Sequence, residues 1–128
     1  MTEKRILVVD DEEQIRHLYQ QAFTQAGYTV HTAASAEEAL EITERTSFKL
    51  FILDLNLPGM NGVELCKEIR SHSPMAICIA VTGYASLFEL HDCREAGFED
   101  YFTKPVSLVE LNEAVEQAFQ KQERWKKR

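Results

Sequence analysis

The sequence predicts an α/β domain with a five-stranded parallel sheet, because strand-like and helix-like patterns alternate five times along its 128 residues. Short apolar, β-branched or aromatic runs mark the expected strands, which occupy 6–9, 28–32, 50–53, 77–81 and 101–103. Apolar residues recur at helical spacing between these runs. A chain of this length suits a single core, and helices that cross over between parallel strands would cover both faces of the sheet.

The polarity of each strand indicates its place in the sheet. The first, third and fourth runs are almost continuously apolar, as in strands that are covered on both faces. The second carries Thr29, His31 and Thr32, which suits an exposed edge. This pattern fits a flavodoxin-like (βα)5 three-layer sandwich with strand order 2-1-3-4-5, although the pattern alone does not prove the order.

The helices have recognisable ends. A capping residue followed three positions later by Glu occurs at Ser35, Asn61, Ser86 and Ser107, and Asp11 with Gln14 is a weaker version. Glycine or proline is expected to follow the first, third and fourth helices, at Gly27, Pro74 and Gly97.

The first and fourth helices differ in the apolar face that each is expected to bury. The first helix should bury Ile15, Leu18, Ala22 and Phe23. The fourth helix has only a thin apolar stripe, Leu87, Leu90 and Cys93, so it should be the least firmly anchored.

Charge and cysteine content exclude several kinds of site. The formal net charge is −7, so direct nucleic-acid binding is not expected, and the basic run 121–128 suits a helix C-terminus. The three cysteines form no CxxC pair, which argues against a disulfide framework or a zinc site.

The longest apolar run, 75–81, is too short to span a bilayer, and no signal-peptide pattern is present. We expect a cytoplasmic protein, with residues 1–122 as the domain and 123–128 as a basic tail or the start of a linker.

Polar side chains follow four of the five expected strands. They are Asp10 and Asp11 after the first, Asp54 after the third, Thr82 after the fourth and Lys104 after the fifth. Each alone would be ordinary, since an Asp after a strand is often a helix cap. Because the carboxyl ends of parallel strands share one edge, we expect these side chains to converge there.

Such a cluster of carboxylates predicts a bound cation. Carboxylates a few ångströms apart repel one another unless a positive group lies between them. Oxygen ligands suit Mg²⁺ or Mn²⁺, with Asp11 and the backbone carbonyl of Asn56 as direct ligands and Asp10 acting through water. Asp54 follows the central strand, and a carboxylate there is the best candidate nucleophile toward phosphorus. Lys104 and Thr82 would stabilise the phosphoryl oxygens.

The combined pattern resembles a known family. The residues that carry the resemblance are Asp10-Asp11, Asp54, Leu57-Pro58-Gly59-Met60-Asn61-Gly62, Thr82-Gly83 and Lys104-Pro105. Together they are similar to the receiver domain of two-component response regulators, over residues 5–121. Asn61 and Gly83 depart from the residues that receivers commonly have, Asp and Ala, and neither departure touches the chemistry.

This resemblance implies roles for the individual residues. Asp54 would accept a phosphoryl group from a phosphohistidine of a sensor histidine kinase or a histidine phosphotransfer domain. Asp10 and Asp11 would hold Mg²⁺ together with Asp54, and Lys104 would contact the phosphoryl group. The Lys104–Pro105 peptide bond would be cis.

The resemblance also implies how the signal leaves the site. Thr82 would be the switch hydroxyl and Tyr101 the switch aromatic, which would rotate from exposed to buried and remodel the face formed by the fourth helix, fifth strand and fifth helix. That face would meet an output domain or partner protein, and it is also a candidate for dimerisation. Asn56 and Tyr84 would tune hydrolysis of the acyl phosphate. Without the resemblance, Tyr101 would be read as a half-buried strand aromatic.

Two other functions share parts of the pattern. Phosphatases of the haloacid dehalogenase type also use an Asp nucleophile and Mg²⁺, but their nucleophile is normally followed two residues later by Asp, where this chain has Asn56. Flavodoxin-type binding modules share the topology but need a Ser-, Thr- or Gly-rich loop after the first strand, where residues 10–13 are acidic. The receiver interpretation is favoured, and it predicts stoichiometric phosphorylation rather than enzymatic turnover.

Overall fold

The computed structural model describes residues 3–83 and 87–126, and these form five strands and five helices in strict alternation. The elements are β1 (Arg5–Val9), α1 (Glu13–Gln25), β2 (Thr29–Ala33), α2 (Ala36–Arg45), β3 (Leu50–Asp54), α3 (Gly62–His72), β4 (Ile77–Thr82), α4 (Leu87–Ala96), β5 (Asp100–Thr103) and α5 (Leu108–Lys126). Every strand pair is parallel and the order is β2-β1-β3-β4-β5. The predicted fold and strand order are therefore confirmed.

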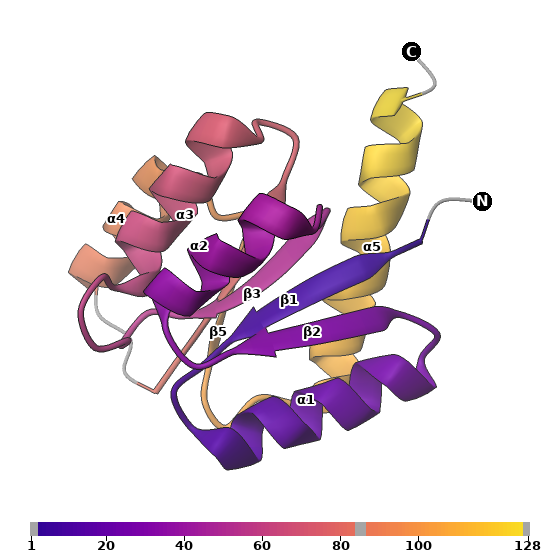
Figure 1. Cartoon of the computed structure of the whole chain (residues 1–128), viewed down its shortest axis with the longest axis horizontal. Helices are drawn as coiled ribbons and strands as arrows, with labels where there is room; N and C mark the ends of the chain where they lie inside the picture. Colours follow the sequence, from indigo (N-terminus) through magenta and orange to yellow (C-terminus); the bar gives the residue numbers. More distant parts are fainter. Residues whose placement is uncertain (1–2, 84–86, 127–128) are drawn as a thin grey trace.

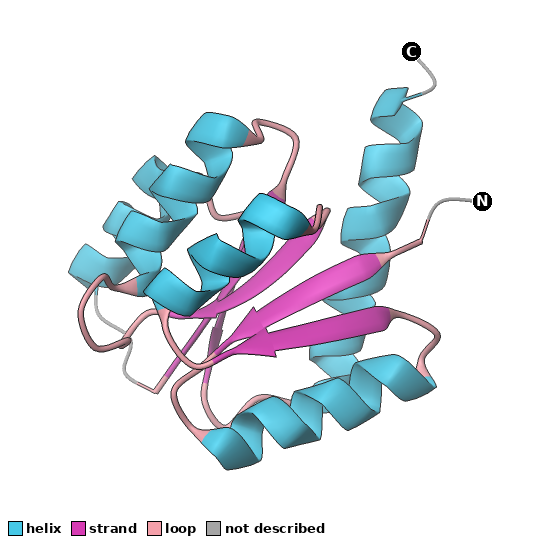
Figure 2. Cartoon of the chain, in the orientation of Figure 1, coloured by secondary structure: helices cyan, strands magenta, loops and turns pink. Residues whose placement is uncertain are grey.

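Three layers are visible, with the sheet between two groups of helices (Figures 1 and 2). Successive residues of β1 point to opposite faces, as strand geometry requires. Leu7 and Val9 lie in the core beneath α2 and α3, whereas Ile6 and Val8 lie in the core beneath α1 and α5. The central strands are buried on both faces because a parallel sheet with crossovers on each side leaves neither face in water.

Most of the predicted helix ends are present. Asn61 and Glu64 form a full capping box at the start of α3. Ser35 Oγ accepts the Glu38 N–H, and Ser107 Oγ accepts the Glu110 N–H at 3.3 Å. Gly27 and Gly97 have φ of 100° and 99°, a conformation that costs glycine little. The pair Ser86 and Glu89 reaches outside the described residues.

The predicted cap at Asp11 is wrong. The N-cap of α1 is Glu12, and its side chain makes no capping hydrogen bond. The Glu12 N–H instead donates to Asp10 Oδ1 at 2.9 Å, so the first aspartate closes the turn before the helix. Asp11 is consequently left exposed at the tip of the loop.

Two apolar residues assigned to buried faces are exposed. Leu18 is 45% exposed, and Tyr19 takes the buried position beside Phe23. Leu90 is 41% exposed, whereas Cys93 of the same predicted stripe is buried as expected, together with Ala96. A single apolar residue at the edge of a helical stripe can face water at little cost, so spacing alone did not identify it.

The last helix continues beyond the predicted limit of the domain. It runs to Lys126, across the expected boundary at 122, which stays a prediction. Gln122 is 7% exposed, and its Nε2 donates to the carbonyl oxygens of Lys49 and Met75 at 3.0 and 2.9 Å. These bonds tie the C-terminal part of α5 to two loops at the amino-terminal edge of the sheet.

Two sequence-based exclusions can be compared with the structure. All three cysteines are buried free thiols, as expected without a disulfide framework. Within residues 3–83 and 87–126, no helix has both the length and the apolar character needed to cross a bilayer.

Candidate functional site

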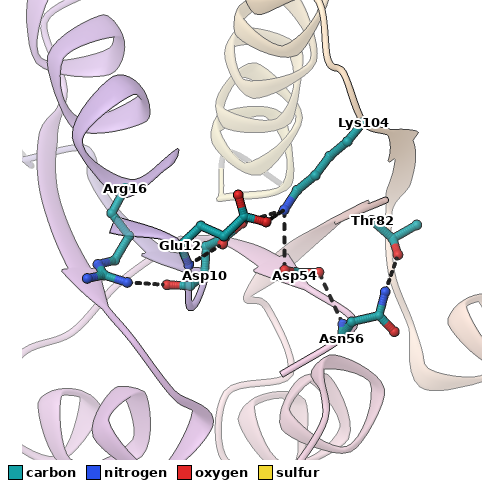
Figure 3. Close-up of polar contacts among 7 residues, drawn as sticks. All are labelled: Asp10, Glu12, Arg16, Asp54, Asn56, Thr82 and Lys104. Atoms are coloured by element: carbon teal, nitrogen blue, oxygen red, sulfur yellow. Dashed lines mark hydrogen bonds and ion pairs between the residues drawn. The ribbon is translucent and has the colours of Figure 1, made fainter. Parts of the chain in front are cut away.

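The carboxyl ends of four strands bring the predicted site residues to one edge of the sheet (Figure 3). Asp10 directly follows β1, Asp54 ends β3 and Thr82 ends β4, and their exposed fractions are only 2%, 5% and 0%. Lys104 directly follows β5 and reaches back toward both aspartates. The parallel sheet thus gathers groups that are far apart in the sequence.

One ammonium group joins the two buried carboxylates. Lys104 Nζ donates to Asp10 Oδ2 at 2.9 Å and to Asp54 Oδ2 at 3.3 Å. Burial alone would lower the pKa of Lys104, but the hydrogen bond and charge of Asp10, followed by those of Asp54, raise it above its usual value. Lys104 therefore stays protonated at neutral pH. The Lys104–Pro105 peptide bond is cis, as expected.

Asp54 has an environment that favours its neutral form. Burial raises the pKa of its carboxyl group, and the charge of Asp10 raises it further. The hydrogen bond from the Asn56 N–H and the charge of Lys104 lower this pKa, but they do not cancel the rise. Oδ1 accepts the Asn56 N–H at 3.1 Å. The negative charge at this edge exceeds what one lysine neutralises, so an additional cation would stabilise the ionised carboxylate.

Thr82 is linked to the loop that follows Asp54. Asn56 Nδ2 donates to Thr82 Oγ1 at 3.1 Å, and the carbonyl oxygen of Thr82 accepts the Lys104 N–H at 2.7 Å. Asn56 and Thr82 therefore connect the loop after Asp54 to the carboxyl ends of β4 and β5.

The first loop holds three carboxylates close together. One oxygen atom from each of Asp10, Asp11 and Glu12 lies within 4.8 Å of the others, and Asp10 alone is buried. Hard oxygen donors of this kind suit Mg²⁺, so the residues fit the predicted ion. Asp54 is not a member of this trio, and it is connected to it through Lys104.

Two charged residues of this site were not predicted from the sequence. Glu12 Oε1 lies 3.7 Å from Lys104 Nζ, and the only available signal was its position beside Asp10 and Asp11. Arg16 Nη1 donates to the Asp10 carbonyl oxygen at 2.7 Å. No sequence pattern distinguishes that contact from an ordinary exposed arginine in a helix.

Gly62 allows the backbone to close behind Asp54. A Cβ at this position would lie 2.3 Å from the Asp54 carbonyl oxygen and 2.8 Å from Leu55 Cα. The Gly62 N–H also donates to the Leu55 carbonyl oxygen at 3.1 Å. Only glycine fits here without moving the strand that carries Asp54.

The residues predicted to transmit or tune the signal lie at different places. Tyr101 is half-buried in β5 against Ala80 and Cys93, and its hydroxyl donates to Glu89 Oε2 at 3.5 Å. Asn56 is exposed beside Asp54. Tyr84 lies outside the described residues.

Comparison with known proteins gives the family. A family model described as the response regulator receiver domain matches residues 6–116. The alkaline phosphatase synthesis transcriptional regulatory protein PhoP of Bacillus subtilis is 39% identical over 94% of this chain and 50% of its own length. The chain thus spans about half the length of that relative.

Two solved structures share both sequence and fold. The CheY-like response regulator receiver domain protein of Methanospirillum hungatei is 37% identical, with a TM-score of 0.93 over 96% of this chain and 98% of that one. The response regulator protein TrrA of Thermotoga maritima, solved in complex with Mg²⁺-BeF, is 36% identical, with a TM-score of 0.82 over 90% and 98%. These similarities favour neither the phosphatase nor the flavodoxin alternative. The chain belongs to the response regulator receiver domain family, whose members are phosphorylatable signalling modules of two-component systems rather than catalytic enzymes.

Proposed function

We propose that Asp54 is the phosphoryl acceptor of this receiver domain. The observation that carries the proposal is the single ammonium of Lys104 shared by two buried carboxylates, Asp10 and Asp54. Two buried negative groups held by one cation leave a net negative pocket, and such a pocket favours binding of a further cation. Asp54 is the last residue of β3, the central strand of the sheet, so it lies at the middle of this edge.

Mg²⁺ is the cation that the donor set supports. Asp10, Asp11, Asp54 and the backbone carbonyl of Asn56 would hold it, and Mn²⁺ would fit the same oxygen ligands. The similarity to TrrA, which was solved with Mg²⁺-BeF, supports this choice. When bound, the ion would supply positive charge to the phosphoryl oxygens and reduce repulsion between phosphate and carboxylate.

The transfer follows from the chemistry of a carboxylate and a phosphohistidine. One Asp54 oxygen forms a bond to phosphorus while the bond between phosphorus and the histidine nitrogen breaks. The electron pair of the broken bond stays on that nitrogen, and the departing imidazole takes up a proton from solvent. The Lys104 ammonium stabilises the charge on the transferred phosphoryl oxygens. Thr82 Oγ1 offers a hydroxyl at the same edge, and its bond to Asn56 would be exchanged for one to the phosphoryl group.

The phosphorylated site would act on the surface formed by α4, β5 and α5. Movement of Thr82 would let Tyr101 turn inward and change this face, because Tyr101 lies in the neighbouring strand against Cys93 of α4. Asn56 and Tyr84 would set the rate of hydrolysis. A histidine kinase or phosphotransfer domain would donate the phosphoryl group in the cytoplasm, and an output domain or effector protein would read the changed face, which is also a candidate dimer contact.

Phosphorylation by acetyl phosphate tests the proposal without the natural donor. The wild-type protein should gain one phosphoryl group in Mg²⁺ and none in excess EDTA, and Asp54→Asn should gain none under either condition. Asp100→Asn is the matched control, because Asp100 is an exposed aspartate at the start of β5, and it should behave like the wild type. Equal labelling of wild type and Asp54→Asn would refute the assignment.

A further inference from the structure

Arg16 has a position at the acidic edge that the phosphoryl chemistry does not use. It lies in the first turn of α1, and its Nη1 donates to the carbonyl oxygen of Asp10 at 2.7 Å. Figure 3 shows Arg16 and Lys104 reaching Asp10 from two sides, Arg16 to its backbone and Lys104 to its side chain. Arg16 is half-buried, so this bond is partly shielded from water.

The bond is placed where the chain leaves the sheet. The Asp10 N–H donates to the Ala33 carbonyl oxygen of β2 at 3.1 Å, which makes it the last backbone group held by the sheet. The Asp10 carbonyl then meets Arg16, and Asp10 Oδ1 accepts the Glu12 N–H at 2.9 Å. These three bonds fix the backbone and the side-chain direction of Asp10 before the exposed part of the loop begins.

The positive charge of Arg16, taken alone, would oppose cation binding at this loop. The guanidinium is bound to the backbone of the loop that carries the carboxylates of Asp10, Asp11 and Glu12, so its positive charge would repel a cation that approaches those carboxylates. An arginine that acted only through its field would therefore weaken cation binding. A guanidinium that holds the loop in its binding geometry would strengthen it, as residues behind metal ligands do.

We infer that Arg16 is a positioning residue that preorganises the acidic loop for the divalent cation by holding the carbonyl of Asp10. This inference rests on the proposed function, because it assumes that Asp10 and Asp11 bind the cation. Arg16 would act through Asp10, because its guanidinium is bound to the Asp10 backbone carbonyl oxygen rather than to a carboxylate. Its removal should weaken cation binding roughly tenfold, the lower end of the loss seen when a group supporting a metal ligand is removed.

Substitution of Arg16 should weaken Mn²⁺ binding if the residue positions the loop, and strengthen it if the residue acts only through its charge. Binding of Mn²⁺ to the full chain can be measured from the electron paramagnetic resonance signal of the free ion, which needs no phosphorylation. Arg16→Met should bind Mn²⁺ roughly tenfold more weakly than wild type. Arg16→Lys keeps a charged donor and should recover part of that loss. Unchanged or tighter binding by Arg16→Met, or no recovery by Arg16→Lys, would overturn the inference.

A control and a substitute variant keep the experiment decisive. Arg5→Met removes the same charge at the other end of β1, about 17 Å from Asp10 at strand spacing, and should leave the affinity close to wild type. If Arg16→Met does not fold, Arg16→Gln replaces it and should also bind Mn²⁺ more weakly than wild type. Glutamine is uncharged and too short to reach the Asp10 carbonyl oxygen as arginine does. Absence of Mn²⁺ binding by the wild type would refute the proposed function itself, whereas wild-type binding without a difference in the variants would refute only the role of Arg16.

Discussion

Removing the ammonium of Lys104 tests the electrostatic design of the site. Lys104→Met keeps most of the side-chain volume and leaves Asp10 and Asp54, which are 2% and 5% exposed, without their shared cation. Breaking a buried ion pair by removing one partner costs about 3–5 kcal/mol. The Lys104 side chain is 17% exposed, so the lower end applies, and we expect a loss of about 3 kcal/mol in the free energy of unfolding.

The loss should depend on pH in a defined direction. The pKa of Lys104 is raised in the folded protein, so its stabilising effect is complete below the unfolded pKa of about 10.4 and disappears as pH rises through the folded value. At the acidic end, protonation of Asp54, whose pKa is raised by burial, removes the charge that Lys104 neutralises. The difference between wild type and Lys104→Met should therefore be greatest near neutral pH.

Urea denaturation without divalent cations measures this difference. Lys121→Met is the matched control, because Lys121 pairs with Glu99 at the surface, where both side chains are about 40% exposed, and should cost about 1 kcal/mol or less. Adding Mg²⁺ should stabilise Lys104→Met more than the wild type, since the ion no longer competes with the ammonium. A loss no greater than that of the control at pH 7 would refute the view that Lys104 neutralises the pocket.

Three further predictions concern neighbouring residues. Gly62→Ala should lower the free energy of unfolding by about 1–3 kcal/mol, because its Cβ would meet the Asp54 carbonyl oxygen at 2.3 Å. Gly83→Ala is the control in the same denaturation assay, because its Cβ would meet no atom of the described residues within 4 Å. Equal losses in the two variants would contradict the reasoning. Asp54→Asn should raise the free energy of unfolding of the cation-free protein at neutral pH, because the raised pKa of Asp54 means that its ionised form opposes folding. This gain should vanish at pH values below the pKa of Asp54 in the unfolded chain, where the carboxyl group is protonated in both states. A lower free energy of unfolding at pH 7 would count against a buried excess of negative charge. Tyr84→Ala should shorten the lifetime of the acyl phosphate by admitting water, and equal decay of a phosphate label in both proteins would exclude that role.

The sequence predicted best those features that depend on local pattern and on parallel-sheet geometry. Continuous apolar runs placed β1, β3 and β4 inside, and polar residues placed β2 at the edge. Because parallel strands end at one edge, listing the residue after each strand was enough to bring Asp10, Asp54 and Lys104 together. The common direction of the strands alone decides that these residues share an edge.

Features that depend on side-chain reach were not predictable in the same way. Arg16 and Glu12 join the site through the conformation of a three-residue loop, which spacing does not encode. The cap expected at Asp11 is absent, because the Asp10 carboxylate accepts the Glu12 N–H and the helix begins one residue later than predicted. Leu18 and Leu90 were assigned to the core by spacing, yet each lies at the edge of its helical stripe and faces water.

Chemical trapping of the acyl phosphate would identify the acceptor residue directly. After treatment with acetyl phosphate and Mg²⁺, borohydride reduces an aspartyl phosphate to homoserine, and peptide mass spectrometry locates the converted residue. Homoserine should appear at position 54, and excess EDTA should abolish it. Homoserine at position 10 or 11 with none at 54, or conversion at 54 that persists without a divalent cation, would contradict a cation-dependent acceptor at Asp54.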